Sequence, residues 1–362
     1  MKGDPTEVQP VLIRGDGVAA YCCAHLLGQA GIPAVLERPS RPRLPAIMLS
    51  EAAIRLLADV FARHDLFHDL PRIRTRAVLW GAGTAPLALP HSAVVVSEQV
   101  LLESLRPQVA ACGFPGEPRG TVFASRPLPP GCVEHGFGSR VARATAVALK
   151  AGAAGCWVES APEGWLFLIG GGDGRGWLLS VGGTDPARSR LVAEQIEDLD
   201  APYGEFPAFP RIIAPLASAA GQFWLACGTA ALAFDPLCGD GTAHAVREAI
   251  LAAAVIRATR SGEHAGEVLA HYESRLTAGF QRHLANCAAF YRTGGDGPWW
   301  KAELHSMERG LAYCAERLSR FPGFRYRLNG YELQLASAAS DSLSPVSGDS
   351  RTQRAPVSAS TE

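Results

Sequence analysis

Residues 11–38, VLIRGDGVAAYCCAHLLGQAGIPAVLER, decide the fold, because their pattern predicts a strand, a turn, a helix and a second strand. After the apolar run 11–13, Gly15, Gly17 and Ala20 follow in G-x-G-x-x-A spacing. This spacing is typical of dinucleotide sites: glycines permit a tight turn and a close pyrophosphate, and the small third residue lets helix and strand pack closely. The helix N-terminus would offer free N–H groups to phosphates. The alternative is a glycine turn in an unrelated strand–helix–strand unit.

The second strand of this stretch ends in a carboxylate. Gly31 suits the end of the helix, residues 32–36 form an apolar run, and Glu37 follows 20 residues after Gly17. At that distance a carboxylate can accept hydrogen bonds from ribose hydroxyls. The stretch as a whole therefore predicts a nucleotide site.

Composition is that of a globular protein. The chain has 362 residues, of which 48% are hydrophobic and 19% charged, enough for one large domain or two closely packed ones. The net charge is −1 and no basic block stands out, which argues against a nucleic-acid partner. Nine cysteines without a C-x-x-C pair predict reduced thiols, a cytoplasmic setting and no metal site.

Neither a signal peptide nor a membrane span is expected. The N-terminal MKGDPTEVQP lacks an apolar core, and the most apolar helix, residues 249–258, is too short to cross a bilayer and contains Arg257.

Helical and strand patterns alternate between residues 46 and 130. Residues 46–62 have helical periodicity, and residues 74–96 have a β-pattern around a turn at 81–84. Ser97 is placed to cap a helix over 98–111. Residues 113–130, rich in Pro and Gly, predict short strands and turns.

From Ala142 onward the sequence pattern changes to one that is typical of β-strands. The runs ATAVALKA, CWVES, GWLFLIG and GWLLSVG, separated by Gly, Pro and Asp, predict a meander of antiparallel strands. A helix is expected over 186–199, a proline-rich connection over 202–215 and a short helix near 215–220.

A second glycine loop follows in residues 222–258. A strand is expected to end at Cys227, and a long alanine-rich helix to begin near Gly241. The chain from there to about residue 335 is predicted to be helical. The remaining tail is mostly Ser, Ala and Pro and is predicted to be disordered.

This layout resembles the FAD-dependent aromatic monooxygenases and the flavin-dependent halogenases, which share one fold. The first glycine turn with Glu37–Arg38 resembles the family's ADP-binding element. Residues 135–140, HGFGSR, are similar to its D-G-x-x-S loop, with His135 in place of the aspartate. Residues 227–241 resemble its G-D-A-A…P-x-x-G-x-G element, which holds the ribitol and isoalloxazine.

The resemblance implies an α/β fold, with a Rossmann-like (GxGxxA) FAD-binding domain, an inserted antiparallel β-sheet substrate domain and a helical C-terminal region. The implied FAD-binding domain is discontinuous and comprises residues 8–75, 97–141 and 222–260. The implied substrate sheet comprises 76–96 and 142–221, the helical region 261–337 and the disordered tail 338–362.

The resemblance also implies the residues that contact FAD. They are Gly15, Asp16, Gly17, Val18, Ala19, Ala20, Glu37, Arg38, Gly228, Thr229, Asp235, Pro236, Gly239, Gly241 and Thr242. A helix that begins near Gly241 points its positive end at the loop, where N–H donors would stabilise negative charge at the flavin N1–C2=O edge. The alternative is a corner between strand and helix without a ligand.

Two residues depart from the family pattern. Thr229 stands where the family has an aspartate that binds the ribitol, and Glu98 stands near the usual position of an arginine. Both changes predict modest flavin affinity.

Three further residues favour hydroxylation over halogenation. The halogenase motif W-x-W-x-I-P is degenerate here, because residues 165–170 read WLFLIG. The halogenase lysine corresponds to Arg76, which stays protonated and is a poor acid. Asp240 lies where halide would bind, and its carboxylate would repel an anion. Arg76 and Asp240 are the predicted catalytic residues; the alternatives are a solvated strand residue and a helix N-cap.

The DPLCGDGT loop and the C-terminal FYR…PWW segment are most similar to a subgroup that hydroxylates tryptophan side chains of another protein to build quinone cofactors. Trp299 and Trp300 would line an open cleft or serve as core anchors.

The resulting hypothesis is an FAD-dependent monooxygenase, reduced by NAD(P)H, that acts on an aromatic substrate, with peptidyl tryptophan as the candidate. The rivals are a halogenase, an FAD-dependent reductase of the same fold and a non-catalytic flavoprotein that assists maturation.

Overall fold

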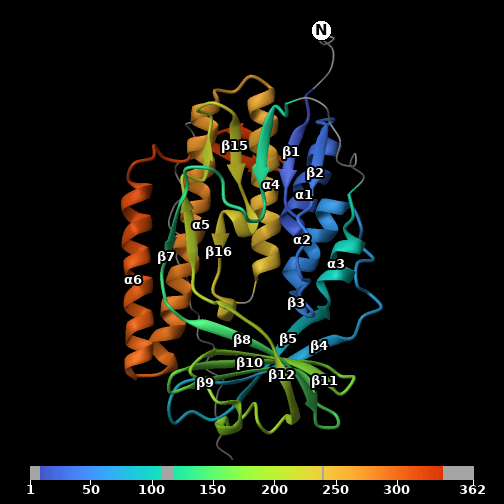
Figure 1. Cartoon of the computed structure of the whole chain (residues 1–362), viewed down its shortest axis with the longest axis vertical. Helices are drawn as coiled ribbons and strands as arrows, with labels where there is room; N and C mark the ends of the chain where they lie inside the picture. Colours follow the sequence, from blue (N-terminus) through green and yellow to red (C-terminus); the bar gives the residue numbers. More distant parts are fainter. Residues whose placement is uncertain (1–8, 108–116, 239, 337–362) are drawn as a thin grey trace, which may run out of the picture.

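The computed structural model describes residues 9–107, 117–238 and 240–336. The predicted tail 338–362 and Gly239 lie outside the described residues. Figure 1 shows a smaller sheet with its helices above a large sheet, and two long C-terminal helices beside them.

The smaller sheet has five strands and brings together distant parts of the chain. Its order is β14 (Ala217–Ser218), β15 (Phe223–Ala226), β6 (Gly120–Phe123), β1 (Val11–Arg14) and β2 (Ala34–Glu37). The four strands β15, β6, β1 and β2 are parallel, whereas β14 is antiparallel to β15. Helices α1 (Val18–Gln29) and α4 (Gly241–Arg260) pack against each other. The predicted segments 8–75, 97–141 and 222–260 thus each contribute strands to one sheet.

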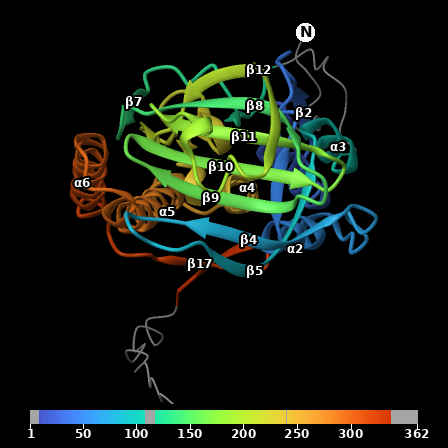
Figure 2. The same cartoon turned by 90° about the horizontal axis from the view of Figure 1, so that it is seen from below.

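The larger sheet has eight strands. Its order is β12 (Ile196–Pro207), β8 (Val141–Leu149), β11 (Arg175–Gly182), β10 (Gly164–Gly171), β9 (Ala154–Ala161), β4 (Arg72–Leu79), β5 (Leu87–Val96) and β3 (Ile47–Ser50). Neighbouring strands are antiparallel except β4 and β9. Figure 2 looks onto this sheet from below. The antiparallel strands predicted over residues 142–182 are confirmed, but only β9, β10 and β11 form a meander, because β8 pairs with β11 and not with β9.

The remaining elements connect and cover the two sheets. A small sheet has the order β16 (Leu232–Ala233), β13 (Arg211–Ala214) and β7 (Val133–Gly136), and β17 (Tyr326–Asn329) pairs with β18 (Glu332–Leu335). The other helices are α2 (Glu51–Phe61), α3 (Glu98–Ser104), α5 (Ala265–Gly294) and α6 (Pro298–Leu318), with 3₁₀ turns η1 (Pro186–Arg188), η2 (Gly228–Ala230) and η3 (Pro236–Cys238). In the described part of the chain, no helix is long and apolar enough to cross a membrane.

The FAD-binding and substrate-domain boundaries remain predictions. Strand β3, from the predicted segment 8–75, pairs with β5 in the large sheet, and β4 begins at Arg72, before the predicted boundary at residue 76.

Two predicted helices begin or end differently. Residues 47–50 are a strand because they pair with β5, and the helix begins at Glu51, where the Ser50 hydroxyl accepts a hydrogen bond from the Ala53 amide. Ser97 caps α3 as predicted, by accepting from the Val100 amide. However, α3 ends at Ser104, shortly before Pro107, which lacks an amide hydrogen. Residues 108–111 lie outside the described residues.

The helix predicted over residues 186–199 is wrong, apart from the single turn η1. The carboxylate of buried Glu159 accepts hydrogen bonds from the amides of Arg190, Leu191 and Val192, which therefore need no helical partners. From Ile196 the chain pairs with β8 instead. A partner distant in sequence overrides the local helical pattern.

The next segments are also more extended than predicted. Strand β12 occupies most of the first half of the predicted connection 202–215, and β13 its end. Instead of a helix near 215–220 there is β14, preceded by the Leu216 amide, which donates to the carboxylate of Glu273 on α5. The predicted C-terminal helices are confirmed as α5 and α6, but residues 326–335 form a hairpin that packs on α4.

We expect Gly228→Ala to lower the free energy of unfolding by about 1–3 kcal/mol, measured by urea titration. Gly228 has φ of +55°, and a Cβ there would lie 2.8 Å from the Ala19 Cβ and 3.1 Å from the Ala124 carbonyl oxygen. The control is Gly221→Ala, where φ is +73° but no atom lies within 4 Å, so that only the backbone cost applies. Equal losses in the two variants would contradict the close approach of η2 to α1.

Candidate functional site

The first glycine turn joins the end of β1 to the start of α1. A Cβ at Gly15 would lie 2.9 Å from the Ala124 Cβ and 3.3 Å from that of Ala20, so only glycine lets the turn pack between β6 and α1. Gly17 is the N-cap residue of α1 and provides no side-chain cap. The N–H groups of the first turn, from Val18 onward, are therefore without a capping side chain and can be offered to an anion.

Two arginines that the sequence motifs did not indicate, Arg41 and Arg43, lie at this turn. The Arg41 guanidinium donates to the Asp16 carbonyl oxygen at 2.6 Å, and its Nη2 lies 3.7 Å from where a Gly17 Cβ would be. Arg43 pairs with the buried Asp16 carboxylate. The signal in the sequence is the R-P-R triplet, residues 41–43, directly after the second strand.

Glu98, the residue that departs from the family pattern, holds Arg41. Its carboxylate is 8% exposed, accepts from Arg41 Nη1 at 2.9 Å and from the Leu44 amide at 2.9 Å, and also pairs with Arg41 Nη2. The bonds from Arg41 and Leu44 lower the pKa of Glu98 despite its partial burial. Glu98 therefore positions a cation beside the turn rather than placing a bare negative charge there.

Glu37 and Arg38 lie at the exposed end of β2. Glu37 pairs with Arg14 on the adjacent strand, with 3.0 Å between Oε2 and Nε. One Arg38 Nη lies 3.5 Å from the Tyr21 hydroxyl, which itself donates to Asp16.

The second glycine loop lies directly against the first. Gly228 lies between Ala19 of α1 and Ala124 after β6, and the Thr229 hydroxyl is 3.5 Å from the Ala124 carbonyl oxygen. The Gly228 amide donates to Glu248 Oε2 at 2.7 Å. Burial raises the pKa of Glu248 to about 8, so this carboxyl is mostly protonated at neutral pH. Thus the structure brings together two motifs that are more than 200 residues apart.

Helix α4 begins next to this loop. Asp240 precedes Gly241 and is the N-cap residue of α4, as the alternative interpretation expected, but its side chain makes no capping hydrogen bond. Its carboxylate instead accepts from the Ser50 hydroxyl at 3.2 Å and lies 3.6 Å from Arg247. Gly241 is exposed and Thr242 half-buried, and both belong to the first turn of α4.

A buried ionic cluster fixes the position of Asp235, which precedes Pro236 in the η3 loop. Arg140, whose side chain is 0% exposed, pairs with both Asp235 and Glu303 of α6. The Tyr291 hydroxyl donates to Asp235 at 3.0 Å, and the Leu237 amide donates to the same carboxylate at 2.8 Å. Because protein groups already occupy this carboxylate, Asp235 sets the shape of the loop rather than presenting oxygens to a ligand.

A cavity of about 250 Å³ lies between the large sheet, η3 and α5. It is lined mostly by apolar and aromatic side chains: Met48, Val78, Trp80, Val158, Trp165, Phe167, Pro236, Leu237 and Phe290, together with Arg76 and Thr293. Since a cavity of about 150 Å³ holds benzene, this one is large enough for a bicyclic aromatic ring.

Arg76 is the cation of this cavity. Its Nη2 lies 3.2 Å from His91 Nε2, and its Nε is buried without a partner. Burial, and then the charge of Arg76, lower the pKa of His91. Asp240 is not among the lining residues, although Met48 of the cavity lies two residues before Ser50, which binds Asp240.

The tryptophan pair differs in role. Trp300 is 1% exposed and donates to the Ala161 carbonyl oxygen at 2.9 Å, which makes it a core anchor. Trp299 is half-buried and stacks on Tyr291, with 6.0 Å between ring centroids. Neither residue lines the cavity of Arg76.

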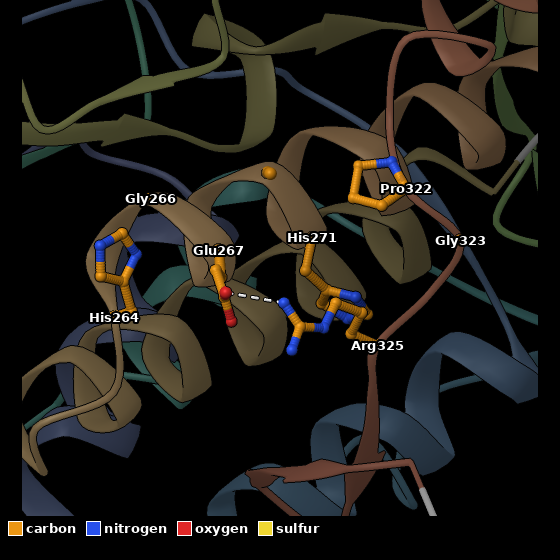
Figure 3. Close-up of a pocket in the computed structure, with 8 residues that line it drawn as sticks. His264, Gly266, Glu267, His271, Pro322, Gly323 and Arg325 are labelled. Atoms are coloured by element: carbon orange, nitrogen blue, oxygen red, sulfur yellow. Dashed lines mark ion pairs between the residues drawn. The ribbon is translucent and has the colours of Figure 1, made fainter. Parts of the chain in front are cut away.

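Another cavity, of about 260 Å³, lies at the start of α5 and contains none of the predicted site residues. Figure 3 shows its Glu267–Arg325 ion pair, with His264 and His271 nearby. The predicted cofactor-binding residues lie instead at the two glycine turns, the end of β2 and the η3 loop, and Arg76 lies in the cavity next to η3.

The chain has the fold of the flavin-dependent aromatic monooxygenases and halogenases. One similar structure is the peptidyl tryptophan dihydroxylase QhpG, essential for tryptophylquinone cofactor biogenesis, with a TM-score of 0.69, 18% identity and coverage of 91% of this chain and 86% of that one. Another is the myxobacterial chondrochloren halogenase CndH, at 0.66 and 16%, covering 88% and 93%. A third is p-nitrophenol 4-monooxygenase PnpA from Pseudomonas putida, at 0.56 and 16%, covering 86% and 97%.

In comparisons of sequence, no protein-family model and no curated protein match the chain.

The two turns fit the FAD that this fold implies. A Cβ at Gly17 would have only Arg41 Nη2 within 4 Å, and a Cβ at Gly241 would have no atom within 4 Å, so both backbones are open to a ligand. Both helices begin without a side-chain cap, and Arg41 adds a positive charge beside the first turn.

We expect Arg140→Met to destabilise the protein by about 3–5 kcal/mol in urea titrations, because it leaves Asp235 and Glu303 buried without their cation. The control is Arg143→Met, whose pair with Glu205 has side chains that are 61% and 54% exposed and should contribute about 0–1 kcal/mol. Similar losses in both variants would show that the buried cluster does not support the loop.

Proposed function

We propose that this protein is an FAD-dependent monooxygenase that hydroxylates an aromatic substrate, with a tryptophan side chain in a partner protein or peptide as the candidate. NAD(P)H is the proposed reductant, and the cytoplasm the proposed setting. The observation that carries the proposal is the aromatic cavity of Arg76, which shares Pro236 and Leu237 with the loop that precedes α4. One wall of the substrate cavity is thus part of the proposed flavin-binding loop.

The cofactor residues follow from the two turns. The amides of Val18 and Ala19 at the start of α1 would bind the pyrophosphate, with Arg41 as counter-charge, and Glu37 would accept from ribose hydroxyls. The first turn of α4, at Gly241 and Thr242, would face the ring system. Bound FAD would supply the activated oxygen for the reaction once reduced by NAD(P)H.

The protein's own residues would orient the substrate and exclude water. Trp80, Trp165 and Phe290 provide apolar walls for an aromatic ring. The half-buried guanidinium of Arg76, which lines the cavity, would offer a hydrogen bond to an acceptor on the substrate, such as a peptide carbonyl. Asp240 lies at the start of α4 and outside the lining of the cavity, so it would take the proton that leaves the ring carbon from a substrate that extends from the cavity toward α4.

Arg76 and Asp240 also support hydroxylation over halogenation. A guanidinium cannot give up a proton as an ammonium does, and a carboxylate at the start of α4 opposes halide binding. Residue 170 is a glycine rather than the proline of the halogenase motif. Among the described residues, the half-buried carboxylate of Asp240 has one hydrogen bond, from the Ser50 hydroxyl, and one ion pair, with Arg247.

A same-fold reductase and a non-catalytic flavoprotein are the rivals. A reductase would oxidise NAD(P)H with substrate in the absence of O₂, whereas a monooxygenase would need O₂. A non-catalytic partner would form no product under either condition.

We expect Gly17→Val to leave the protein folded but without FAD, because the branched side chain would occupy the space proposed for the pyrophosphate. The structure has room for it, since only Arg41 Nη2 lies near a Gly17 Cβ. The optical spectrum after FAD reconstitution measures the loss, and circular dichroism measures the fold. Gly28→Val, in the same helix with no atom within 4 Å, is the control and should retain FAD. A full-strength flavin spectrum in Gly17→Val would refute the assignment.

We expect the wild type, with FAD, NAD(P)H, O₂ and a tryptophan-containing peptide or small aromatic substrate, to give products heavier by one or two oxygens. Asp240→Asn should keep FAD but slow product formation by about 10²–10⁴-fold if the carboxylate takes the ring proton. Arg247→Met, which removes the ion-pair partner and keeps the carboxylate, should remain close to the wild type. The reactions are run with chloride and bromide present, and mass spectrometry of the products distinguishes a monooxygenase from a halogenase. Halogenated products would contradict hydroxylation.

A further inference from the structure

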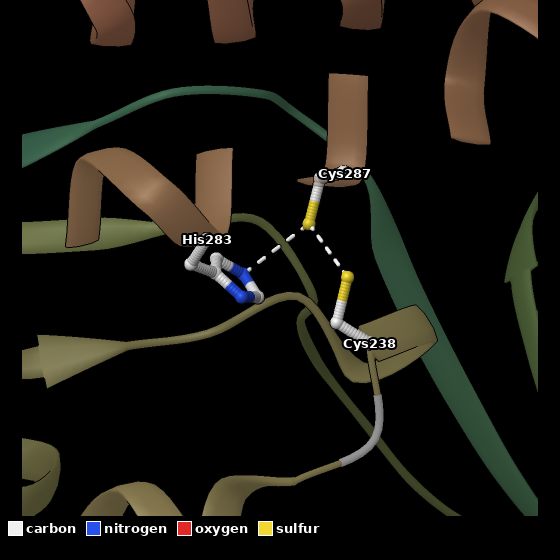
Figure 4. Close-up of side chains that lie close together, drawn as sticks. All are labelled: Cys238, His283 and Cys287. Atoms are coloured by element: carbon white, nitrogen blue, oxygen red, sulfur yellow. Dashed lines mark hydrogen bonds between the residues drawn. The ribbon is translucent and has the colours of Figure 1, made fainter. Parts of the chain in front are cut away.

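Two thiols meet where the η3 loop contacts α5. Cys238 is the last residue of η3, and its Sγ lies 3.2 Å from the Sγ of Cys287, 49 residues later in the chain. Cys238 is half-buried, whereas Cys287 is 0% exposed. Figure 4 shows Cys287 between the Cys238 side chain and the ring of His283, which lies one helical turn away on α5.

The three side chains are a possible metal site by composition, but His283 is already occupied. Its Nε2, 3.3 Å from Cys287 Sγ, accepts a hydrogen bond from the Asp235 amide at 2.8 Å. A metal on this nitrogen would displace that bond and leave a buried amide without an acceptor. The two sulfurs are therefore the pair that is free to react.

We propose that Cys238 and Cys287 form a reversible disulfide when the protein meets hydrogen peroxide or a related peroxide. The sulfurs need to approach each other by only about 1 Å to reach bonding distance. The proposal does not depend on the proposed function, since it requires the two thiols and a peroxide and no flavin or substrate.

The difference in exposure between Cys238 and Cys287 decides which thiol reacts with the peroxide first. The half-buried Cys238 thiolate attacks one oxygen of the peroxide, which breaks the O–O bond and gives a sulfenic acid and, with a proton, water. The Cys287 sulfur then attacks the Cys238 sulfur and displaces hydroxide, which leaves as water with the Cys287 proton. Two thiols and one hydrogen peroxide thus become one disulfide and two waters. The contact with Cys238 and burial raise the pKa of Cys287, so this thiol is not the one that reacts with the peroxide. Its part in the second step rests on proximity, because its Sγ already lies 3.2 Å from that of Cys238.

The bond would join two walls of the aromatic cavity. Pro236 and Leu237 of η3 form one wall, and Phe290 and Thr293 of α5 form part of another. Oxidation would therefore hold η3 on α5 two residues before Asp240.

The test uses the full chain, reduced with a phosphine, freed of reductant and then exposed to hydrogen peroxide. After unfolding in acid, free thiols are alkylated and the digested protein is analysed by mass spectrometry. We expect a linked peptide that joins Cys238 to Cys287, the loss of two alkylation sites, reversal by dithiothreitol, and a thermal midpoint higher by several degrees in the oxidised protein.

Cys238→Ser should abolish the linked peptide and leave Cys287 alkylated. Cys132→Ser, another half-buried cysteine, whose thiol contacts the Pro215 carbonyl oxygen, should retain it. Full alkylation of both Cys238 and Cys287 after peroxide would overturn the proposal. So would one zinc per chain in the purified wild type that is lost in Cys238→Ser, since this would assign a metal centre instead.

Discussion

The interaction on which the site depends is the buried contact of Arg140 with Asp235 and Glu303. One cation and two carboxylates are removed from water here, which is favourable only if hydrogen bonds surround them. Tyr291, the Leu237 amide and the Ser139 amide and hydroxyl provide those bonds. The cluster thereby ties the loop after β7, η3, α5 and α6 to one point. A displacement of Asp235 would cost free energy, because it would separate this buried carboxylate from the Arg140 guanidinium.

The two glycine turns allow backbone segments to approach each other closely. Gly15 and Gly228 lie against Ala124 and the start of α1, where a side chain would collide. Their small size brings β1, β6 and η2 together and leaves the starts of α1 and α4 open. Arg41, held by Glu98, supplies the positive charge that the family pattern places elsewhere. A residue that departs from a motif can thus keep its electrostatic effect through a neighbour.

The sequence was most informative where local chemistry decides the structure. The glycine spacing, the Ser97 cap and the alternating runs from Ala142 predicted the first turn, the start of α3 and the individual strands β8 to β11, since each depends on residues close in the chain. The helix over 186–199 could not be excluded in the same way. Its backbone amides bind Glu159, more than 25 residues earlier, and its end pairs with β8.

Sequence alone determined the two glycine turns, the antiparallel strands after Ala142, and Arg76 and Asp240 as candidate residues, because spacing and residue type carry that information. Only the tertiary structure decided which of these residues meet. It placed Arg76 in a cavity with Pro236, turned the Asp235 carboxylate toward Arg140, and brought Cys238 against Cys287. The physical reason is that these contacts join segments tens to hundreds of residues apart, whose approach is set by packing of whole helices and sheets and not by any local pattern.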